Sequence, residues 1–305
     1  MGRRETVAIA VVVRDRFSMF PRCLEALSAH TDSRVRILVV VGGADEATTD
    51  FLRDRRDQDH NLTLVLPDHP LTQAEARRCA LRAVHEPFCV ILENDTIVHA
   101  DWLGPLLRCM HEESAAVVAP LVMWYRGIHA AGGEIAERRD GGVTTLTHSI
   151  EYGDIRRRRI GYPESHCVLL DLDRIGDIDL FDDVEPFDVD VGLTLRARGL
   201  PVFLEPQSVV TYEAPPPYER RDIPPTLLRW DPTAWAERNE AFTRKWRVAY
   251  DASAKVASYR RQQAKLALVR RHPTRAGVMA TNLAVGASNR VVTALTSRRT
   301  RRSFG

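Results

Sequence analysis

Two carboxylates stand one residue apart at the end of an apolar run. The run is FCVILE, residues 88–93, so that Glu93 ends it and Asp95 follows after one further residue. Carboxylates at this spacing on a loop are able to face one divalent cation, because Mg²⁺ and Mn²⁺ prefer oxygen ligands and share their coordination with substrate phosphates. In the alternative, Glu93 caps the following helix and Asp95 is a turn residue. From the acids alone the two interpretations carry equal weight.

Strand and helix patterns alternate around this pair. Buried strands are expected at residues 7–13, 34–41, 62–66 and 88–93, and helices at 20–29, 46–56, 73–84 and 102–113. This order predicts an α/β fold with a doubly wound, mixed and mostly parallel sheet. Ligands bind outside the carboxyl ends of such strands. Polar or flexible residues just past these ends are Asp15, Gly42, Gly43, Asp68, Glu93, Asn94 and Asp95.

The pattern changes after residue 115. Strands are expected at 115–123, 166–172 and 200–206, a Gly-rich β-leaning stretch at 132–153, and helices at 190–199 and 230–246. A Pro-rich segment at 214–225 is interpreted as a linker or as a loop that closes over a site. His166 stands at the start of a buried strand and is expected to be a structural histidine rather than a contact to the acceptor.

Composition points to a cytoplasmic protein. The five cysteines are scattered without zinc-type spacing, which is typical of reduced thiols. No apolar run approaches the ~20 residues of a membrane-spanning helix, and the apolar run at 7–13 is too short for a signal peptide. The net charge is +2, yet residues 252–305 hold twelve Lys and Arg and no acid. This basic tail is predicted to rest on an anionic membrane surface; in the alternative it docks on the acidic body or is disordered.

The order of the motifs resembles family-2 glycosyltransferases of the GT-A fold. The stretches that carry the resemblance are VAIAVVVRDRFSMFPRCLEAL, EARRCAL, LENDTIVHADWLGPLL, IGDIDLFDD, FDVDVGLTLRARG and VFLEPQSVVTY, within residues 6–213. They are similar, in this order, to the opening strand and helix of the family, its A-R-N segment, its D-x-D metal motif, its G-x-F-D-E motif, its E-D-x-D helix and its last strand. The resemblance implies transfer of a sugar from a nucleotide-diphosphate sugar to an acceptor hydroxyl.

The resemblance also implies roles for single residues. Glu93 and Asp95 would coordinate Mn²⁺ or Mg²⁺ bound to the donor diphosphate, and Arg77 would contact the nucleotide or its phosphates. Asp188 would be the general base, with Asp190 as the second candidate. A base and a metal on opposite sides of the anomeric carbon imply a single in-line displacement, and therefore an inverting transfer.

The sequence departs from the family pattern at the base-reading acid. Val41 stands where the family has the acid that recognises the nucleobase, so this position cannot recognise uracil through a carboxylate. Asp15, Asp45 or Asp68 is expected to substitute for it, and Asn94 is expected to join Asp15, Arg77 and Asp68 in binding the nucleotide sugar.

Two further departures leave alternatives open. Phe187 occupies the position of the first acid in the E-D pair. Tyr212 occupies the position of the late histidine that assists the metal in some members of the family. A degenerate GT-A-fold binding or scaffold protein without turnover is therefore the first alternative. The second is a sugar-nucleotidyltransferase, although its Gly-rich, basic loop is missing after Val13.

Three segments are predicted along the chain. Residues 1–213 would form the transferase domain, with a nucleotide-sugar half at about 1–115 and an acceptor half at about 116–213. A Pro-rich segment and a Trp-bearing helix follow at 214–251, and the basic helical tail occupies 252–305. The expected partners are the donor and a saccharide, lipid-linked or small-molecule acceptor, and not nucleic acid. The expected setting is cell-envelope polysaccharide synthesis in the cytoplasm, with peripheral contact to the inner face of the membrane through the tail.

Overall fold

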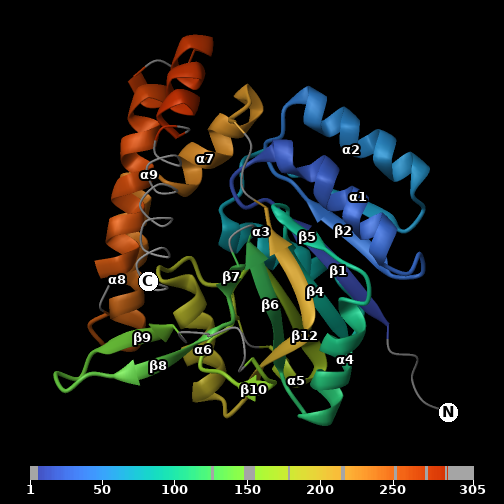
Figure 1. Ribbon diagram of the computed structural model, residues 1–305, viewed down its shortest axis with the longest axis vertical. Helices are drawn as coiled ribbons and strands as arrows, with labels where there is room; N and C mark the ends of the chain where they lie inside the picture. The colour runs from blue at the N-terminus through green and yellow to red at the C-terminus, as the bar shows by residue number, and fades with distance from the viewer. Residues whose placement is uncertain are drawn as a thin grey trace, which may run out of the picture.

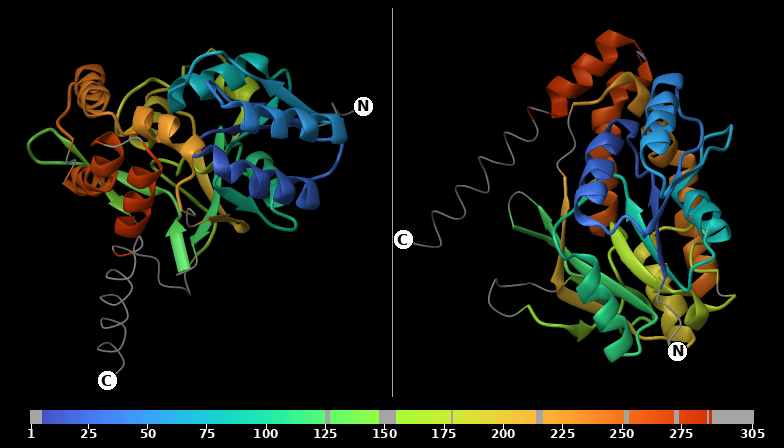
Figure 2. Two further views of the ribbon diagram at one scale, coloured as in Figure 1. Left: turned by 90° about the horizontal axis from the view of Figure 1, so that it is seen from above. Right: turned by 90° about the vertical axis from the view of Figure 1, so that its right-hand side faces the viewer.

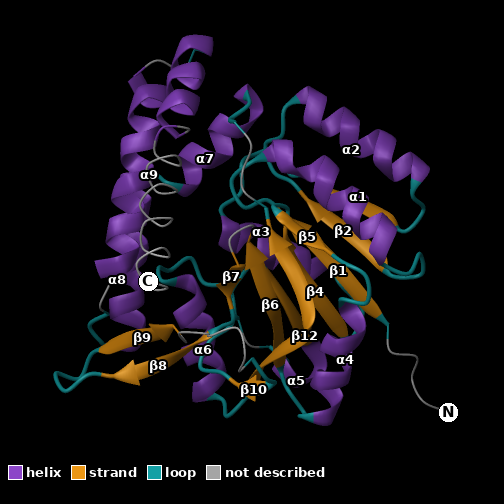
Figure 3. Cartoon of the chain, viewed as in Figure 1, coloured by secondary structure: helices purple, strands orange, loops and turns teal. Residues whose placement is uncertain are grey.

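A mixed sheet forms the centre of the molecule in the computed structural model (Figures 1 and 3). The structure describes residues 6–124, 127–147, 155–177, 179–213, 217–250, 253–271, 274–285 and 287. The order of strands across the sheet is β10, β12, β6, β11, β4, β1, β2 and β3, with β5 paired to β12 and β7 paired to β6. The strands are β1 (Val7–Val12), β2 (Arg36–Val40), β3 (Leu62–Val65), β4 (Phe88–Glu93), β5 (Thr96–Val98), β6 (Val117–Trp124), β7 (Gly127–Ala130), β10 (Arg158–Arg159), β11 (Cys167–Asp171) and β12 (Val202–Tyr212).

Most strands along this path point the same way, as the sequence predicts. β1 pairs in parallel with β2 and β4, β2 with β3, and β6 with β12. β11 runs antiparallel between β4 and β6, and β10 runs antiparallel on β12. The carboxyl ends of β1, β2, β3 and β4 therefore meet at one edge of the sheet.

The sheet is buried on both faces, because its strands alternate between two apolar cores. In β1, Val7, Ile9 and Val11 enter one core. The intervening Ala8, Ala10 and Val12 enter the other. The first face packs on α1 (Phe20–His30), α2 (Glu46–Gln58) and α4 (Leu103–Glu112). The second face packs on α3 (Gln73–Ala83), α5 (Leu172–Ile175) and α6 (Phe187–Ala197).

The Gly-rich stretch forms a hairpin away from the main sheet. Its strands β8 (Gly133–Glu137) and β9 (Val143–Thr147) pair with each other as a separate two-stranded sheet. Gly133 also bonds to Tyr162, and a Cβ at Gly133 would lie 2.3 Å from the Tyr162 hydroxyl. This close approach explains the need for glycine there.

Helices from the C-terminal third pack against the loop that follows β1. They are α7 (Ile223–Arg229), which continues the 3₁₀ helix η2 (Arg220–Asp222), then α8 (Pro232–Trp246) and α9 (Ser253–Arg271), followed by a helical segment at 275–285. In α7, the Thr226 hydroxyl donates to the backbone oxygen of Asp15 at 2.7 Å. α8 and α9 lie side by side (Figures 1 and 2), and Trp235 stacks on Tyr259 with ring centroids 4.2 Å apart.

Several element ends differ from the sequence prediction. The helix expected at 190–199 begins at Phe187, so that Asp188 lies in its first turn. The strand expected at 200–206 continues to Tyr212, because β12 shifts register against β6 and goes on pairing. The Pro-rich segment is a helix in its later part, since Pro224 and Pro225 occupy the first turn of α7, where no backbone donor is needed. Residues 214–216 of that segment, and 252, 272–273, 286 and 288–305 of the tail, lie outside the described residues.

Candidate active site

Asn94 ties the end of β4 to the loop after β1. Its side-chain oxygen accepts from the backbone nitrogen of Arg14 at 3.0 Å, and its side-chain nitrogen donates to the backbone oxygen of Arg16 at 2.7 Å. Its own backbone nitrogen donates to Val12. Asn94 is fully buried, so its side-chain amide fixes the loop after β1 against the end of β4. The sequence prediction gave it a nucleotide-sugar contact instead.

The two carboxylates on either side of Asn94 face arginines. Glu93 Oε1 accepts from Arg77 at 2.7 Å and from the side-chain nitrogen of Gln73 at 3.1 Å. Arg14 lies across the pair, with its Nε 3.3 Å from Glu93 Oε2 and its terminal nitrogen 3.3 Å from Asp95 Oδ2. Both acids are almost fully buried, which makes these charge contacts strong.

Burial and charge set the pKa values of the two acids apart. Burial raises the pKa of Asp95 to about 6, and the attraction of Arg14 offsets only part of this rise. Burial also pushes up the pKa of Glu93, but the surrounding cationic side chains, Arg14 first, outweigh it and hold the pKa below its ordinary value. Within the described residues, Glu93 Oε2 and Asp95 Oδ1 are buried and accept no hydrogen bond. Two such oxygens on neighbouring carboxylates fit a divalent cation.

A cavity opens at this edge of the sheet, in front of Arg14 and Arg77. It is surrounded by the loops after β1 and β3, the loops before β11 and α6, and helices α3, α6, α7, α8 and α9. The polar and aromatic residues that line it include Arg14, Thr72, Gln73, Arg77, Ser165, Asp182, Asp183, Glu185, Asp188, Arg229, Trp230, Trp235, Arg238 and Ser258. Arginine side chains bind phosphate groups through two parallel hydrogen bonds. Carboxylates accept hydrogen bonds from sugar hydroxyls, and tryptophan rings pack on the apolar faces of sugars.

Asp188 lies on the cavity wall beside Arg77. Arg77 is 1% exposed, and its guanidinium stacks on the Phe187 ring at 4.4 Å from the centroid. Burial lowers the pKa of Arg77, while the charges of Glu93 and then Asp188 act in the opposite direction. The Arg77 guanidinium thus forms an ion pair with Glu93 and interacts with the charge of the base candidate Asp188 on the same cavity wall.

Asp190 lies apart from Asp188, although only two residues separate them. Residues at this spacing point to different sides of a helix. Asp190 is fully buried, accepts from Trp246 Nε1 at 2.7 Å, and lies 2.8 Å from the Lys245 ammonium. Burial raises its pKa. These contacts make Asp190 the anchor of α8 on α6.

The acids proposed to read the nucleobase are elsewhere. Asp15 accepts from Trp230 Nε1 at 3.4 Å and so joins the loop after β1 to α7. Asp45 caps α2 by accepting from the backbone nitrogen of Thr48. Asp68 has a fully exposed side chain that pairs with His69. None of the three lines the cavity described above.

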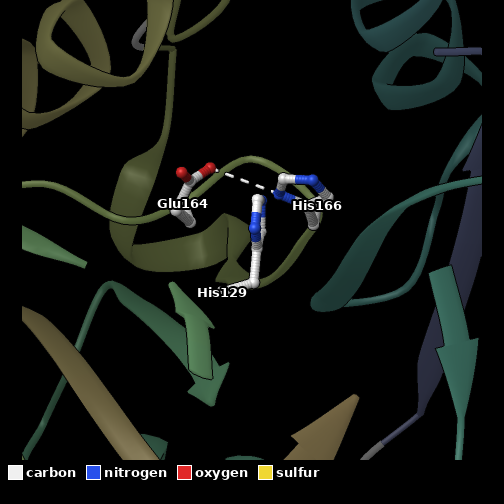
Figure 4. A group of neighbouring side chains, drawn as sticks. All are labelled: His129, Glu164 and His166. Atoms are coloured by element: carbon white, nitrogen blue, oxygen red, sulfur yellow. Dashed lines mark hydrogen bonds and ion pairs between the residues drawn. The ribbon is translucent and has the colours of Figure 1, made fainter. Parts of the chain in front are cut away.

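A histidine cluster adjoins the carboxylate pair on the far side of Arg14. His166 is 2% exposed, with Nε2 2.5 Å from a terminal nitrogen of Arg14 and Nδ1 3.2 Å from Glu164. His129 lies next to Glu164 and His166 (Figure 4), and its ring centroid is 4.9 Å from that of His166. Tyr212, at the end of β12, packs on both imidazole rings. His166 is structural in that it supports Arg14, as the sequence predicts, but it also belongs to this cluster.

The sequence prediction missed Arg14, Arg229 and Arg238 at the cavity. Arg14 follows a buried strand at the same edge as Asp15, and this position was a usable signal. Arg229 and Arg238 belong to α7 and α8, more than 200 residues from β1. Nothing local in their sequence marks them, because only the packing of these helices brings them to the cavity.

Comparisons with known proteins identify the family and agree with the fold. The family model described as "Glycosyl transferase family 2" matches residues 8–164. Among solved structures, the crystal structure of GalNAc-T7 with UDP, GalNAc and Mn²⁺ is similar in fold, with a TM-score of 0.56 and 11% sequence identity. The match covers 76% of this chain and 49% of that chain, so this chain spans about half the length of that protein. No curated protein matches the sequence.

Proposed function

The chain belongs to glycosyl transferase family 2, and from this premise we propose that it moves a sugar from a nucleotide-diphosphate sugar to an acceptor hydroxyl with inversion at the anomeric carbon. One observation carries the proposal. A single cavity wall holds Arg77, which is paired with Glu93 of the acidic motif, next to Asp188. A phosphate-binding cation and a base thus face the same space.

The proposed chemistry is one displacement. Asp188 takes the proton of the acceptor hydroxyl, and the resulting oxygen bonds to the anomeric carbon as the bond from that carbon to the diphosphate breaks. The electron pair leaves with the diphosphate. Arg77, with Arg229 and Arg238 across the cavity, is proposed to hold the diphosphate oxygens and to balance their growing charge. Asp190 has no part in this step, since Lys245 and Trp246 hold it away from the cavity.

Glu93 and Asp95 would hold a divalent cation, Mn²⁺ or Mg²⁺. Their buried oxygens without hydrogen bonds favour this role, and the bound cation would offset charge on the leaving diphosphate. Arg14 now lies across both carboxylates. Its side chain is 19% exposed and reaches the cavity, so we propose that it turns towards the cavity when the cation binds.

Donor binding tests this function. A screen of UDP-, GDP- and dTDP-sugars, each with and without Mn²⁺, is expected to find one class that binds. The scaffold alternative predicts that none binds. Membership of the family already favours sugar transfer over the sugar-nucleotidyltransferase alternative.

The tail both docks on the body and presents an apolar pair outward. Leu266 and Val278 are buried with Tyr218, as the docking alternative predicts. Met279 and Leu283 lie one helical turn apart in the segment 275–285, with 66% and 62% of their surface exposed. Within the described residues, no helix has the length and apolar character needed to cross a bilayer. We propose that this pair inserts into an anionic membrane surface and that Arg275 and the basic residues at the end of α9, Arg270 and Arg271, face the lipid headgroups.

Replacing both apolar side chains tests the membrane contact. Met279→Ser with Leu283→Ser is expected to weaken binding to vesicles containing phosphatidylglycerol by at least ten-fold, because each large apolar side chain contributes on the order of 1–2 kcal/mol when buried in the interface, and a ten-fold change corresponds to about 1.4 kcal/mol. Sedimentation with vesicles measures the fraction of each protein that is bound. Neutral phosphatidylcholine vesicles should bind both proteins poorly. Equal binding of wild type and variant to the anionic vesicles would show that the pair does not touch the membrane.

A further inference from the structure

Three side chains with metal-binding atoms converge beside Arg14. His129 belongs to β7, while Glu164 and His166 belong to the loop that leads into β11 (Figure 4). One ligand atom from each lies within 4.8 Å of the other two. His166 Nδ1 lies 3.2 Å from Glu164 Oε2.

The types of ligand in this cluster select among metals. Two imidazoles and one carboxylate form a set that Zn²⁺ takes in proteins, with bonds of about 2.0–2.2 Å and a position left for water. The hard ions Mg²⁺ and Ca²⁺ prefer an all-oxygen set. Tetrahedral bonds of that length place ligand atoms about 3.3 Å apart. The ligand atoms, which lie within 4.8 Å of one another, must therefore approach by about 1.5 Å at most, a distance within the reach of small side-chain rotations.

The surroundings hold the central ligand and leave the site open to solvent. The His166 ring is buried and packs against the rings of His129 and Tyr212, whose centroids each lie 4.9 Å from its own. Side chains packed in this way keep one orientation. His129 is exposed and Glu164 is part-exposed, so an ion has a path from solvent to the cluster.

We propose that His129, Glu164 and His166 bind one Zn²⁺ ion, at a site separate from the cation site of Glu93 and Asp95. The ion links β7 to the loop before β11. Zinc on His166 Nδ1 places the ring proton on Nε2. Arg14 then has no acceptor at this nitrogen, and its guanidinium is released towards the cavity that it lines. The zinc ion thereby acts on the arginine that covers the acidic pair.

Zinc titration of the full chain tests this site. Protein freed of any affinity tag and dialysed against chelator is titrated with ZnCl₂ by calorimetry, and one ion per chain is expected to bind. His129→Ala should weaken binding at least ten-fold, as should Glu164→Gln. His129 is exposed, but its ring also packs on His166 and Tyr212. Thermal unfolding without zinc therefore checks that His129→Ala stays folded, and Glu164→Gln, which keeps all three rings, serves as the second variant. Co²⁺ in place of Zn²⁺ is expected to give the visible absorption of a tetrahedral site, which His129→Ala removes.

Two control variants locate the ion. His60→Ala removes an exposed imidazole at the end of α2, far from the cluster in sequence, and should bind zinc like the wild type. Asp95→Asn should also keep zinc binding, because Asp95 belongs to the other site. The proposal is overturned if the wild type binds no zinc, if His129→Ala binds it equally well, or if Asp95→Asn abolishes it.

Discussion

Asp188→Asn is expected to lower the rate of sugar transfer by about a thousand-fold while donor affinity stays within about two-fold. Removal of a general base costs on the order of 10²–10⁴ in rate, and an amide cannot take the proton of the acceptor. Asp188 faces the cavity from the first turn of α6, so the change leaves the core untouched. Release of nucleoside diphosphate from the donor that binds best, with water or an alkyl glycoside as acceptor, measures the rate, and calorimetry measures the affinity.

Two matched variants separate the base from its neighbours. Asp182→Asn makes the same change on the same cavity wall, at a side chain held by Lys245, and should keep most of the activity. Asp190→Asn should lower the melting temperature, because Asp190 is a buried partner of Lys245 and Trp246. Its activity loss should follow the folded fraction. Turnover by Asp188→Asn at the rate of the wild type would move the base elsewhere, and so would an inactive Asp190→Asn that melts normally.

Arg14→Gln is expected to tighten Mn²⁺ binding at least ten-fold in the absence of donor. Arg14 contacts both carboxylates that would hold the ion, so the ion must displace it. Two unit charges about 4 Å apart interact by about 4 kcal/mol at an effective dielectric constant of 20, and about 1.4 kcal/mol is enough for a ten-fold change. Asp95→Asn is expected to act in the opposite direction, because it removes a ligand. Calorimetric titration with MnCl₂ measures both.

The control for this prediction is another arginine of the cavity. Arg238→Gln removes the same charge, but Arg238 contacts Asp183 and the backbone of Arg229 rather than the acidic pair. Its Mn²⁺ affinity should stay within about two-fold of the wild type. Unchanged or weaker binding by Arg14→Gln would show that Arg14 does not compete with the cation.

The central sheet could be predicted from local sequence. The run FCVILE becomes β4 with the predicted ends, and VAIAVV becomes β1. Both strands are buried on two faces, so their residues are apolar without interruption. The short strands β5, β7 and β10 escaped prediction, because they pair at the edges of the sheet over two to four residues and leave no period to detect.

The site could be predicted only in part. The acidic pair stands out in the local sequence, whereas the roles of Arg77 and Asp188 are predicted from the resemblance to the family. The partners of these residues come from distant segments. Arg14 meets Asp95 across 81 positions of sequence, and Lys245 holds Asp190 across 55. Such pairs depend on how the helices and loops pack, which no local pattern records.

The most direct test of the proposed function is a calorimetric titration of the wild-type chain with UDP-, GDP- and dTDP-sugars, with and without Mn²⁺. One nucleotide class is expected to bind with micromolar affinity in the presence of Mn²⁺, and Asp95→Asn should lose the part of that affinity that depends on the metal. If no nucleotide sugar binds under either condition, the chain is not the proposed transferase, and the scaffold alternative takes its place.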